Sequence, residues 1–160
     1  MDQLWAPWRT HYVSGAVRTE GCVFCTALAA GDDRRALVIR RGQQAFLILN
    51  AFPYASGHLM AALTRHGGGL LEATSAELGE AMALVQMGMK ALRAAYRPDG
   101  FNVGVNEGWV AGAGVPDHLH LHVVPRWKGD TNFMPVLGDV RVLPESLEAT
   151  YDRLTAAFDS

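Results

Sequence analysis

Apolar and polar residues alternate along some short segments of the chain and follow a helical period along others. An alternation with a period of two is typical of a strand, whereas apolar residues three and four positions apart are typical of an amphipathic helix. The first pattern predicts a strand at residues 118–124, and short apolar segments bounded by turn residues predict strands at 36–40, 45–49, 58–63 and 101–106. The second pattern predicts helices at residues 22–30, 74–96 and 145–158.

The helix predicted at 74–96 has the clearest ends. Thr74 followed three residues later by Glu77 is a capping box, and Pro98-Asp99-Gly100 stops the helix. The order of strands, a long helix, further strands and a C-terminal helix predicts an α+β fold with a largely antiparallel sheet of about five strands. The 160 residues fit a single domain.

Composition and charge narrow the class of protein. The net charge of -2 and the isoelectric point near 6.3 give the chain no bulk attraction for nucleic acid or for a membrane surface. No segment approaches the roughly 20 uninterrupted apolar residues of a membrane span. The N-terminus also lacks a basic segment followed by an apolar run. We therefore expect a cytoplasmic protein with neither a nucleic-acid nor a membrane partner.

Three histidines occupy alternate positions of the strand predicted at 118–124. His118, His120 and His122 share one face of that strand, and the intervening leucines share the other. Such a row offers nucleophilic nitrogen, hydrogen-bond donors and metal ligands near neutral pH. Two other interpretations remain open, a solvated strand face with incidental histidines and a simple three-histidine metal site.

The loop before this strand favours phosphate over metal. It contains Asn106-Glu107-Gly108 and Gly112-Ala113-Gly114. Glycine lets backbone N–H groups approach an anion closely, because no Cβ stands in the way. The alternative is a flexible connection between two strands. The position of the loop directly ahead of the histidines favours a phosphate site.

These motifs resemble the histidine triad family. The segment His118–Val124 matches that family's signature, His-x-His-x-His followed by two apolar residues, and Asn50 through Gly57-His58 matches its loop of an Asn, a Pro and a Gly-His pair. The resemblance covers about residues 22–127, which we take as the core of a single domain of that fold, with N- and C-terminal extensions packed on it. Trp5–Arg9 and Pro125–Phe133 resemble the bacterial diadenosine tetraphosphate phosphorylase-like branch.

The resemblance implies a mechanism centred on His120. This residue would attack the α-phosphorus and carry a nucleotidyl group, which water or inorganic phosphate then removes. The second ring nitrogen has to be held as a donor, for which the carbonyl of His118 is suited. His122 would bind phosphate or assist the leaving group. The other implied residues are His58 near the nucleophile, Asn50 at the ribose and Asn106 at the phosphates.

One position departs from the family pattern. Gly114 stands four residues before His118, where the family often has Gln or Ser, so no side chain acts there. The backbone N–H groups of Ala113 and Gly114, and Gly112 beside them, remain available to a phosphate oxygen. The departure leaves the leaving-group preference open.

Cys22 and Cys25 have the spacing of a zinc knuckle but supply only two of four ligands. Resemblance to zinc-bearing members of the wider superfamily implies His66 and His118 as the other two, in a structural zinc site. The alternative is a pair of reduced, buried cysteines beside an exposed His66. No organic cofactor is expected.

The favoured function is a dinucleoside polyphosphate phosphorylase or hydrolase that acts on an adenine nucleotide. The resemblance also implies a homodimer, which the family commonly forms through a helix and an edge strand. Hydrolysis of nucleoside phosphoramidates or mixed anhydrides is an enzymatic alternative. A nucleotide-binding sensor with weak catalysis and a zinc-dependent scaffold are alternatives from other classes.

Overall fold

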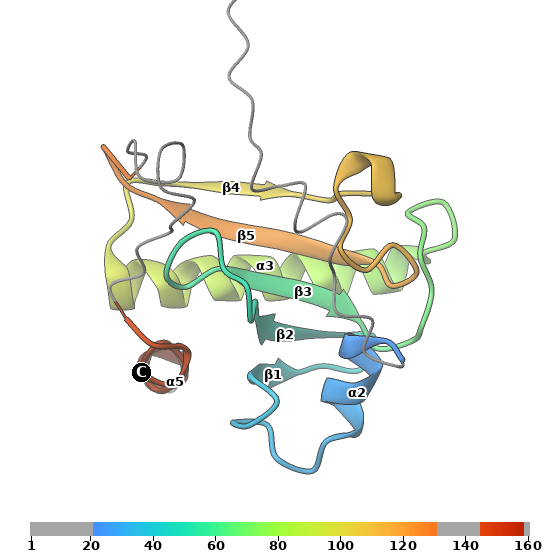
Figure 1. Cartoon of the computed structure of the whole chain (residues 1–160), viewed down its shortest axis with the longest axis horizontal. Helices are drawn as coiled ribbons and strands as arrows, with labels where there is room; N and C mark the ends of the chain where they lie inside the picture. The colour runs from blue at the N-terminus through green and yellow to red at the C-terminus, as the bar shows by residue number, and fades with distance from the viewer. Residues whose placement is uncertain (1–20, 131–144, 159–160) are drawn as a thin grey trace, which may run out of the picture.

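Residues 21–130 and 145–158 are described in the computed structural model of the chain (Figure 1). They contain one sheet with the strand order β1-β2-β3-β5-β4, in which every neighbouring pair is antiparallel. The strands are β1 (Val38–Arg41), β2 (Ala45–Leu49), β3 (Leu59–Leu63), β4 (Gly100–Gly104) and β5 (His120–Arg126). The expected α+β fold with five antiparallel strands is confirmed.

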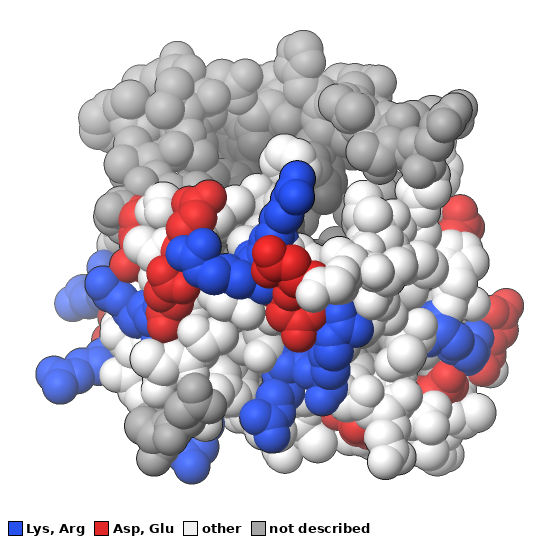
Figure 2. Space-filling view, turned by 90° about the horizontal axis from the view of Figure 1, so that it is seen from below, with Lys and Arg blue, Asp and Glu red and all other residues white. Residues whose placement is uncertain are grey.

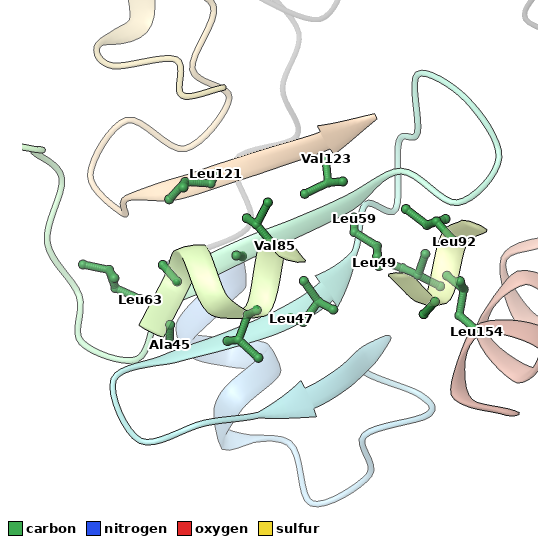
Figure 3. Close-up of a cluster of buried hydrophobic side chains, with 14 of the residues drawn as sticks. Ala45, Leu47, Leu49, Leu59, Leu63, Val85, Leu92, Leu121, Val123 and Leu154 are labelled. Carbon is green, nitrogen blue, oxygen red and sulfur yellow. The ribbon is translucent and has the colours of Figure 1, made fainter. Parts of the chain in front are cut away.

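The helix α3 (Ser75–Tyr96) covers one face of the sheet. It starts at the predicted capping box, in which the Thr74 side chain accepts from the Glu77 N–H and the Glu77 carboxylate accepts from the Thr74 N–H. Leucine, valine and alanine side chains from the helix and the strands form the main core between them (Figure 3), including Leu47, Leu59, Leu63, Val85, Leu92, Leu121 and Val123.

The opposite face of the sheet carries the histidines and a smaller apolar cluster. In the pairing of β3 with β5, Ala62 lies opposite His120 and Met60 lies opposite His122, so these four side chains share a face. The short helix α2 (Val23–Ala29) packs on this face through Phe24 and Ala27. The cluster consists of Phe24, Ala27, Val38, Phe46, Ile48, Met60 and Ala62.

The C-terminal helix α5 (Leu147–Phe158) packs against α3 and β1. Leu154 is buried in the main core, and the Tyr151 hydroxyl donates to the Val38 carbonyl at 3.1 Å. Arg34 and Asp152 form a two-bond ion pair at the surface, which contributes little to stability because both groups are solvated. The helix is two residues shorter than predicted, beginning at Leu147 and not at Glu145.

Several strand boundaries differ from the predictions. β5 begins at His120, two residues later than predicted, because the His118 N–H donates to the Val115 carbonyl in a turn that ends only there. β1 begins at Val38, after Leu37 with a φ of 62°. The segment predicted as a strand at 101–106 lies at Gly100–Gly104. The segment Trp5–Arg9 lies outside the described residues.

The surface gives no sign of a charged binding face on the side drawn in Figure 2. There, Lys and Arg side chains are interspersed with Asp and Glu side chains over the part of the chain that is described. Within residues 21–130 and 145–158, no helix combines the length and the apolar character needed to cross a bilayer. The mixed charges agree with the low net charge of the sequence.

Candidate active site

His120 stands at the first position of β5, and only 4% of the residue is exposed. Its Nδ1 lies 2.8 Å from the carbonyl oxygen of His118, the contact expected from the sequence. A carbonyl oxygen can only accept, so the ring hydrogen is on Nδ1. Neutral His120 therefore keeps a lone pair on Nε2, the nitrogen that a nucleophile needs.

A second chain of contacts fixes the tautomer of His122. The backbone N–H of Tyr54 donates to Nδ1 of the buried His58 at 3.1 Å, which places the hydrogen of neutral His58 on Nε2. His58 Nε2 lies 2.9 Å from His122 Nδ1 and donates to it. Neutral His122 therefore has its hydrogen on Nε2, where it can donate to a phosphate oxygen.

Burial keeps these imidazoles neutral. It lowers the pKa of His122 to about 4, and the neighbouring His120 adds to the shift. Burial also lowers the pKa of His120, against the opposing effect of the hydrogen bond to the His118 carbonyl. At pH 7 the row thus presents one nitrogen lone pair and one N–H donor, and neither ring carries a charge.

Asn50 lies in the loop between β2 and β3, and its side chain is occupied by that loop. Its Oδ1 accepts from the Phe52 N–H at 2.9 Å, and its Nδ2 lies 3.3 Å from His58 Nδ1. Asn50 is buried, with 6% of the residue exposed. Its hydrogen bonds stabilise the loop conformation in which the Tyr54 N–H donates to His58. The ribose contact expected for Asn50 stays a prediction.

The glycine-rich loop is more structured than expected. Trp109–Ala111 forms a 3-10 turn, and the N–H groups of Gly112 and Ala113 donate to the carbonyls of Trp109 and Gly108 at 3.0 Å and 3.3 Å. These two N–H groups already donate to carbonyls inside the loop. They therefore do not point freely at an anion, contrary to what the glycine content predicts. The Asn106 side chain donates weakly to the Gly112 carbonyl at 3.5 Å.

The four residues proposed as zinc ligands come together. One ligand atom from each of Cys22, Cys25, His66 and His118 lies within 4.8 Å of every other. The Sγ atoms of Cys22 and Cys25 lie 3.2 Å and 3.7 Å from His118 Nδ1, and Cys25 Sγ lies 3.5 Å from His66 Nδ1. Sulfur and nitrogen ligands of tetrahedral zinc are about 3.5 Å apart, given the usual bond lengths.

His118 is oriented to offer a nitrogen lone pair to this cluster. Its Nε2 lies 2.7 Å from the Leu63 carbonyl oxygen, so the ring hydrogen is on Nε2 and Nδ1 faces the thiols unprotonated. A carbonyl partner on the remote ring nitrogen is the usual arrangement of a metal-binding histidine. The donor set therefore fits a structural zinc ion.

Two residues of the site were not found by sequence reasoning. Tyr54 orients His58 through its backbone N–H, which no side-chain pattern reveals, and its ring lies 4.6 Å from the His58 ring. Phe24 packs its ring against both His118 and His120. The only sequence signal for Phe24 is its place between the two cysteines.

The sheet, the buried histidine row and the loop before β3 define a histidine triad protein. A model of the HIT domain matches residues 33–129, which is more than half of the chain. The chain belongs to the HIT domain family.

Individual relatives agree with this assignment. Over 157 residues the chain is 37% identical to the AP-4-A phosphorylase of Mycobacterium tuberculosis, covering 94% of this chain and 80% of that protein. The crystal structure of a zinc-bound histidine triad family protein from Mycobacterium smegmatis has a TM-score of 0.70 at 27% identity, covering 87% of this chain and 94% of that one. A hypothetical histidine triad nucleotide-binding protein from Sulfolobus tokodaii shares the fold with a TM-score of 0.68 at 24% identity, over 86% of this chain and 92% of that chain.

Proposed function

We propose that the protein is a dinucleoside polyphosphate phosphorylase or hydrolase that works through a nucleotidyl group on His120. The observation that carries the proposal is the 2.8 Å contact between His120 Nδ1 and the His118 carbonyl. This contact leaves Nε2 as the nucleophilic nitrogen and restrains one side of the ring. The similarity to the AP-4-A phosphorylase of Mycobacterium tuberculosis supports the substrate class.

The reaction has two displacements at one phosphorus. In the first, the Nε2 lone pair of His120 forms a bond to the α-phosphorus, and the bond from that phosphorus to the bridging oxygen breaks. The electron pair leaves with the polyphosphate, to which His122 Nε2–H donates a hydrogen bond. In the second, an oxygen of water or of inorganic phosphate forms a bond to the phosphorus, the bond from phosphorus to His120 Nε2 breaks, and its electron pair returns to Nε2. An acceptor water also gives up a proton to solvent.

The products identify the acceptor. Attack on an α-phosphorus of diadenosine tetraphosphate releases ATP and leaves an adenylyl group on His120. Water then yields AMP, whereas phosphate yields ADP.

The surroundings of His120 favour a polyphosphate over an amine as leaving group. A polyphosphate departs as a stable anion and needs hydrogen-bond donors only. An amine released from a phosphoramidate has to be protonated as it departs. Gly114 offers no side chain that could protonate the amine. The low pKa of His122 leaves its ring neutral at pH 7, so the ring can donate a hydrogen bond but does not act as a charged acid.

We also propose that zinc binds to Cys22, Cys25, His66 and His118 in a structural role. A bound zinc would supply four strong bonds that hold α2 and the segment before β5 together, with no open position for substrate. The zinc-bound relative from Mycobacterium smegmatis supports this. Loss of zinc would then reduce the stability of the fold more than the rate of the chemical step.

The homodimer remains a proposal with support from the sheet edge. Among the described strands β4 lies at the edge of the sheet, and Val103 on it is 42% exposed, so this edge offers backbone donors and an apolar side chain to a second copy. Sedimentation equilibrium of the full chain tests it, since a monomer at micromolar concentration would contradict the proposal.

The function is tested by incubating the full chain with diadenosine tetraphosphate, with and without inorganic phosphate, and separating the products by chromatography. We expect ATP with ADP when phosphate is the acceptor, or ATP with AMP when water is. The variant His120→Asn should fold normally and lose turnover. Full activity of that variant, or two ADP molecules formed without added phosphate, would contradict the proposal.

A further inference from the structure

Phe24 occupies a central place between the cysteine cluster and the nucleophile. It lies in the first turn of α2, between Cys22 and Cys25 in the sequence, and only 2% of it is exposed. Phe24 and Ala27 are the buried residues of this helix, so α2 contributes little else to the interior. The placement of Phe24 thus depends on how firmly α2 is held.

The Phe24 ring lies against two of the three triad histidines. Its centroid is 4.9 Å from the centroid of His118 and 4.9 Å from that of His120, with interplanar angles of 46° and 41°. Phe46 supports the far side in an edge contact at 6.3 Å. These distances lie within the range of direct aromatic packing.

The hydrogen bond of His120 alone does not fix the direction of Nε2. A single bond from Nδ1 to the His118 carbonyl restrains one side of the ring, but the ring can still tilt about that bond. A rigid aromatic surface against the ring face removes this freedom. Displacement of a reacting atom by about 1 Å can cost roughly 100-fold in rate, so the restraint has consequences for catalysis.

The helix that carries Phe24 is held at both ends. At its start, Cys22 Sγ lies 3.2 Å from His118 Nδ1. At its end, the Arg41 guanidinium donates to the carbonyls of Leu28 and Ala30 at 3.0 Å and 3.4 Å. The first contact joins α2 to the segment before β5, and the second joins it to β1.

We propose that Phe24 is a positioning residue for His120, and that the contacts at the two ends of α2 keep its ring against the nucleophile. This inference rests on the proposed role of His120 in catalysis. It assigns to α2 a task in the reaction beyond the binding of metal: the helix sets the direction of the attacking nitrogen. Phe24 itself forms no bond with the substrate in this role.

The variant Phe24→Leu tests the inference, with Phe101→Leu as the matched control. Both changes remove an aromatic ring, but Phe101 packs against the main core under α3, on the other side of the sheet. We expect Phe24→Leu to lower kcat about tenfold with little change in KM, because the orientation of His120 matters for the chemical step. Phe101→Leu should lower the thermal stability and leave kcat near the wild-type value.

A second measurement needs no substrate. In the wild type, the Nδ1–H of His120 should exchange slowly with solvent and give a sharp signal in proton–nitrogen spectra of the imidazoles, assigned by its loss in His120→Asn. Phe24→Leu should broaden or abolish that signal, and Phe101→Leu should keep it. Phe24→Met, whose flexible unbranched side chain adapts to irregular spaces in a core, provides the same comparison should Phe24→Leu fail to fold.

The outcomes separate this inference from the proposed function. A wild-type protein without turnover would contradict the proposed function, and the His120 N–H signal would still decide whether Phe24 positions the ring. An unchanged signal and an unchanged kcat in the Phe24 variants would overturn the inference. Equal losses of kcat in Phe24→Leu and Phe101→Leu would also overturn it, because they would show a general effect of destabilisation.

Discussion

His58 Nε2 lies 2.9 Å from His122 Nδ1, and the Tyr54 N–H that donates to the other nitrogen of His58 determines the direction of this hydrogen bond. A single backbone group thereby determines which nitrogen of His122 carries a hydrogen. His122 is a donor at Nε2 because the loop between β2 and β3 makes it one. The loop therefore sets the hydrogen-bonding state of the third triad histidine, which the proposed mechanism uses.

Replacing His58 tests this arrangement. His58→Leu removes the donor to His122, so His122 can adopt the other tautomer and lose its N–H toward the leaving oxygen. We expect kcat to fall roughly 100-fold, the cost of losing one oriented donor. His58→Gln can still accept from Tyr54 and donate to His122, and it should retain more activity than His58→Leu. Equal activities of the two variants would contradict the proposed relay.

Removal of zinc should act mainly on stability. Purified full-length protein should contain one zinc per chain by elemental analysis, and the double variant Cys22→Ser, Cys25→Ser should contain none. At free zinc 100-fold above the dissociation constant, the bound ion stabilises the fold by about 3 kcal/mol. A chelator should therefore lower the Tm of the wild type and leave that of the double variant unchanged. A wild type that contains no zinc would disprove the site.

Gly68 is predicted to be intolerant of a side chain. A Cβ at this position would lie 2.7 Å from the Pro116 carbonyl oxygen and 3.2 Å from the Asp117 Cα, both in the segment that leads into β5. Gly68→Ala should cost about 1–3 kcal/mol, the range for overpacking, and lower kcat by displacing His118. Gly79→Ala is the control, because nothing lies within 4 Å of a Cβ there.

Gly79→Ala should be neutral or stabilising by up to about 1 kcal/mol, since Gly79 lies inside α3, where alanine is the better helix former. Chemical denaturation of both variants gives the comparison. A Gly68→Ala variant as stable as Gly79→Ala would show that the segment before β5 can move at no cost.

The lowered pKa of Glu77 predicts that the fold loses stability in acid. Hydrogen bonds from Arg65 and from the Thr74 backbone lower the pKa of this carboxylate to about 2. A group with a lowered pKa stabilises the fold fully above its ordinary pKa near 4.5, and this contribution is lost as the pH falls toward 2. Glu77→Gln should be less stable than the wild type at pH 7, and the difference should shrink between pH 4.5 and pH 2. A constant difference would refute this assignment.

Local signals predicted much of the fold. The capping box at Thr74 and Glu77 located the start of α3, because both partners lie within one turn. The short apolar run from Ala45 to Leu49, preceded by turn residues, predicted β2 with its observed limits. The turn at Val115 and His118 was missed, since its residues alternate like the strand that follows and only pairing with β3 shows where the strand begins.

The sequence predicted which residues form the site better than it predicted the contacts between them. The three triad histidines, His58 and the four cysteine and histidine ligands are brought together where motifs and family resemblance indicated. The internal hydrogen bonds of Gly112 and Ala113 were not foreseen, because glycine content indicates flexibility and does not say which amides are already satisfied. Phe24 and Tyr54 act through ring packing and a backbone N–H, which leave no spacing pattern.

The stereochemical course at the α-phosphorus tests the central claim most directly. Diadenosine tetraphosphate that carries sulfur in one configuration at its α-phosphorus is converted by the full chain, with phosphate or isotopically labelled water as acceptor, and the product configuration is read by phosphorus NMR. Two successive displacements through His120 predict overall retention. Inversion would show direct transfer to the acceptor and would contradict a nucleotidyl-His120 intermediate.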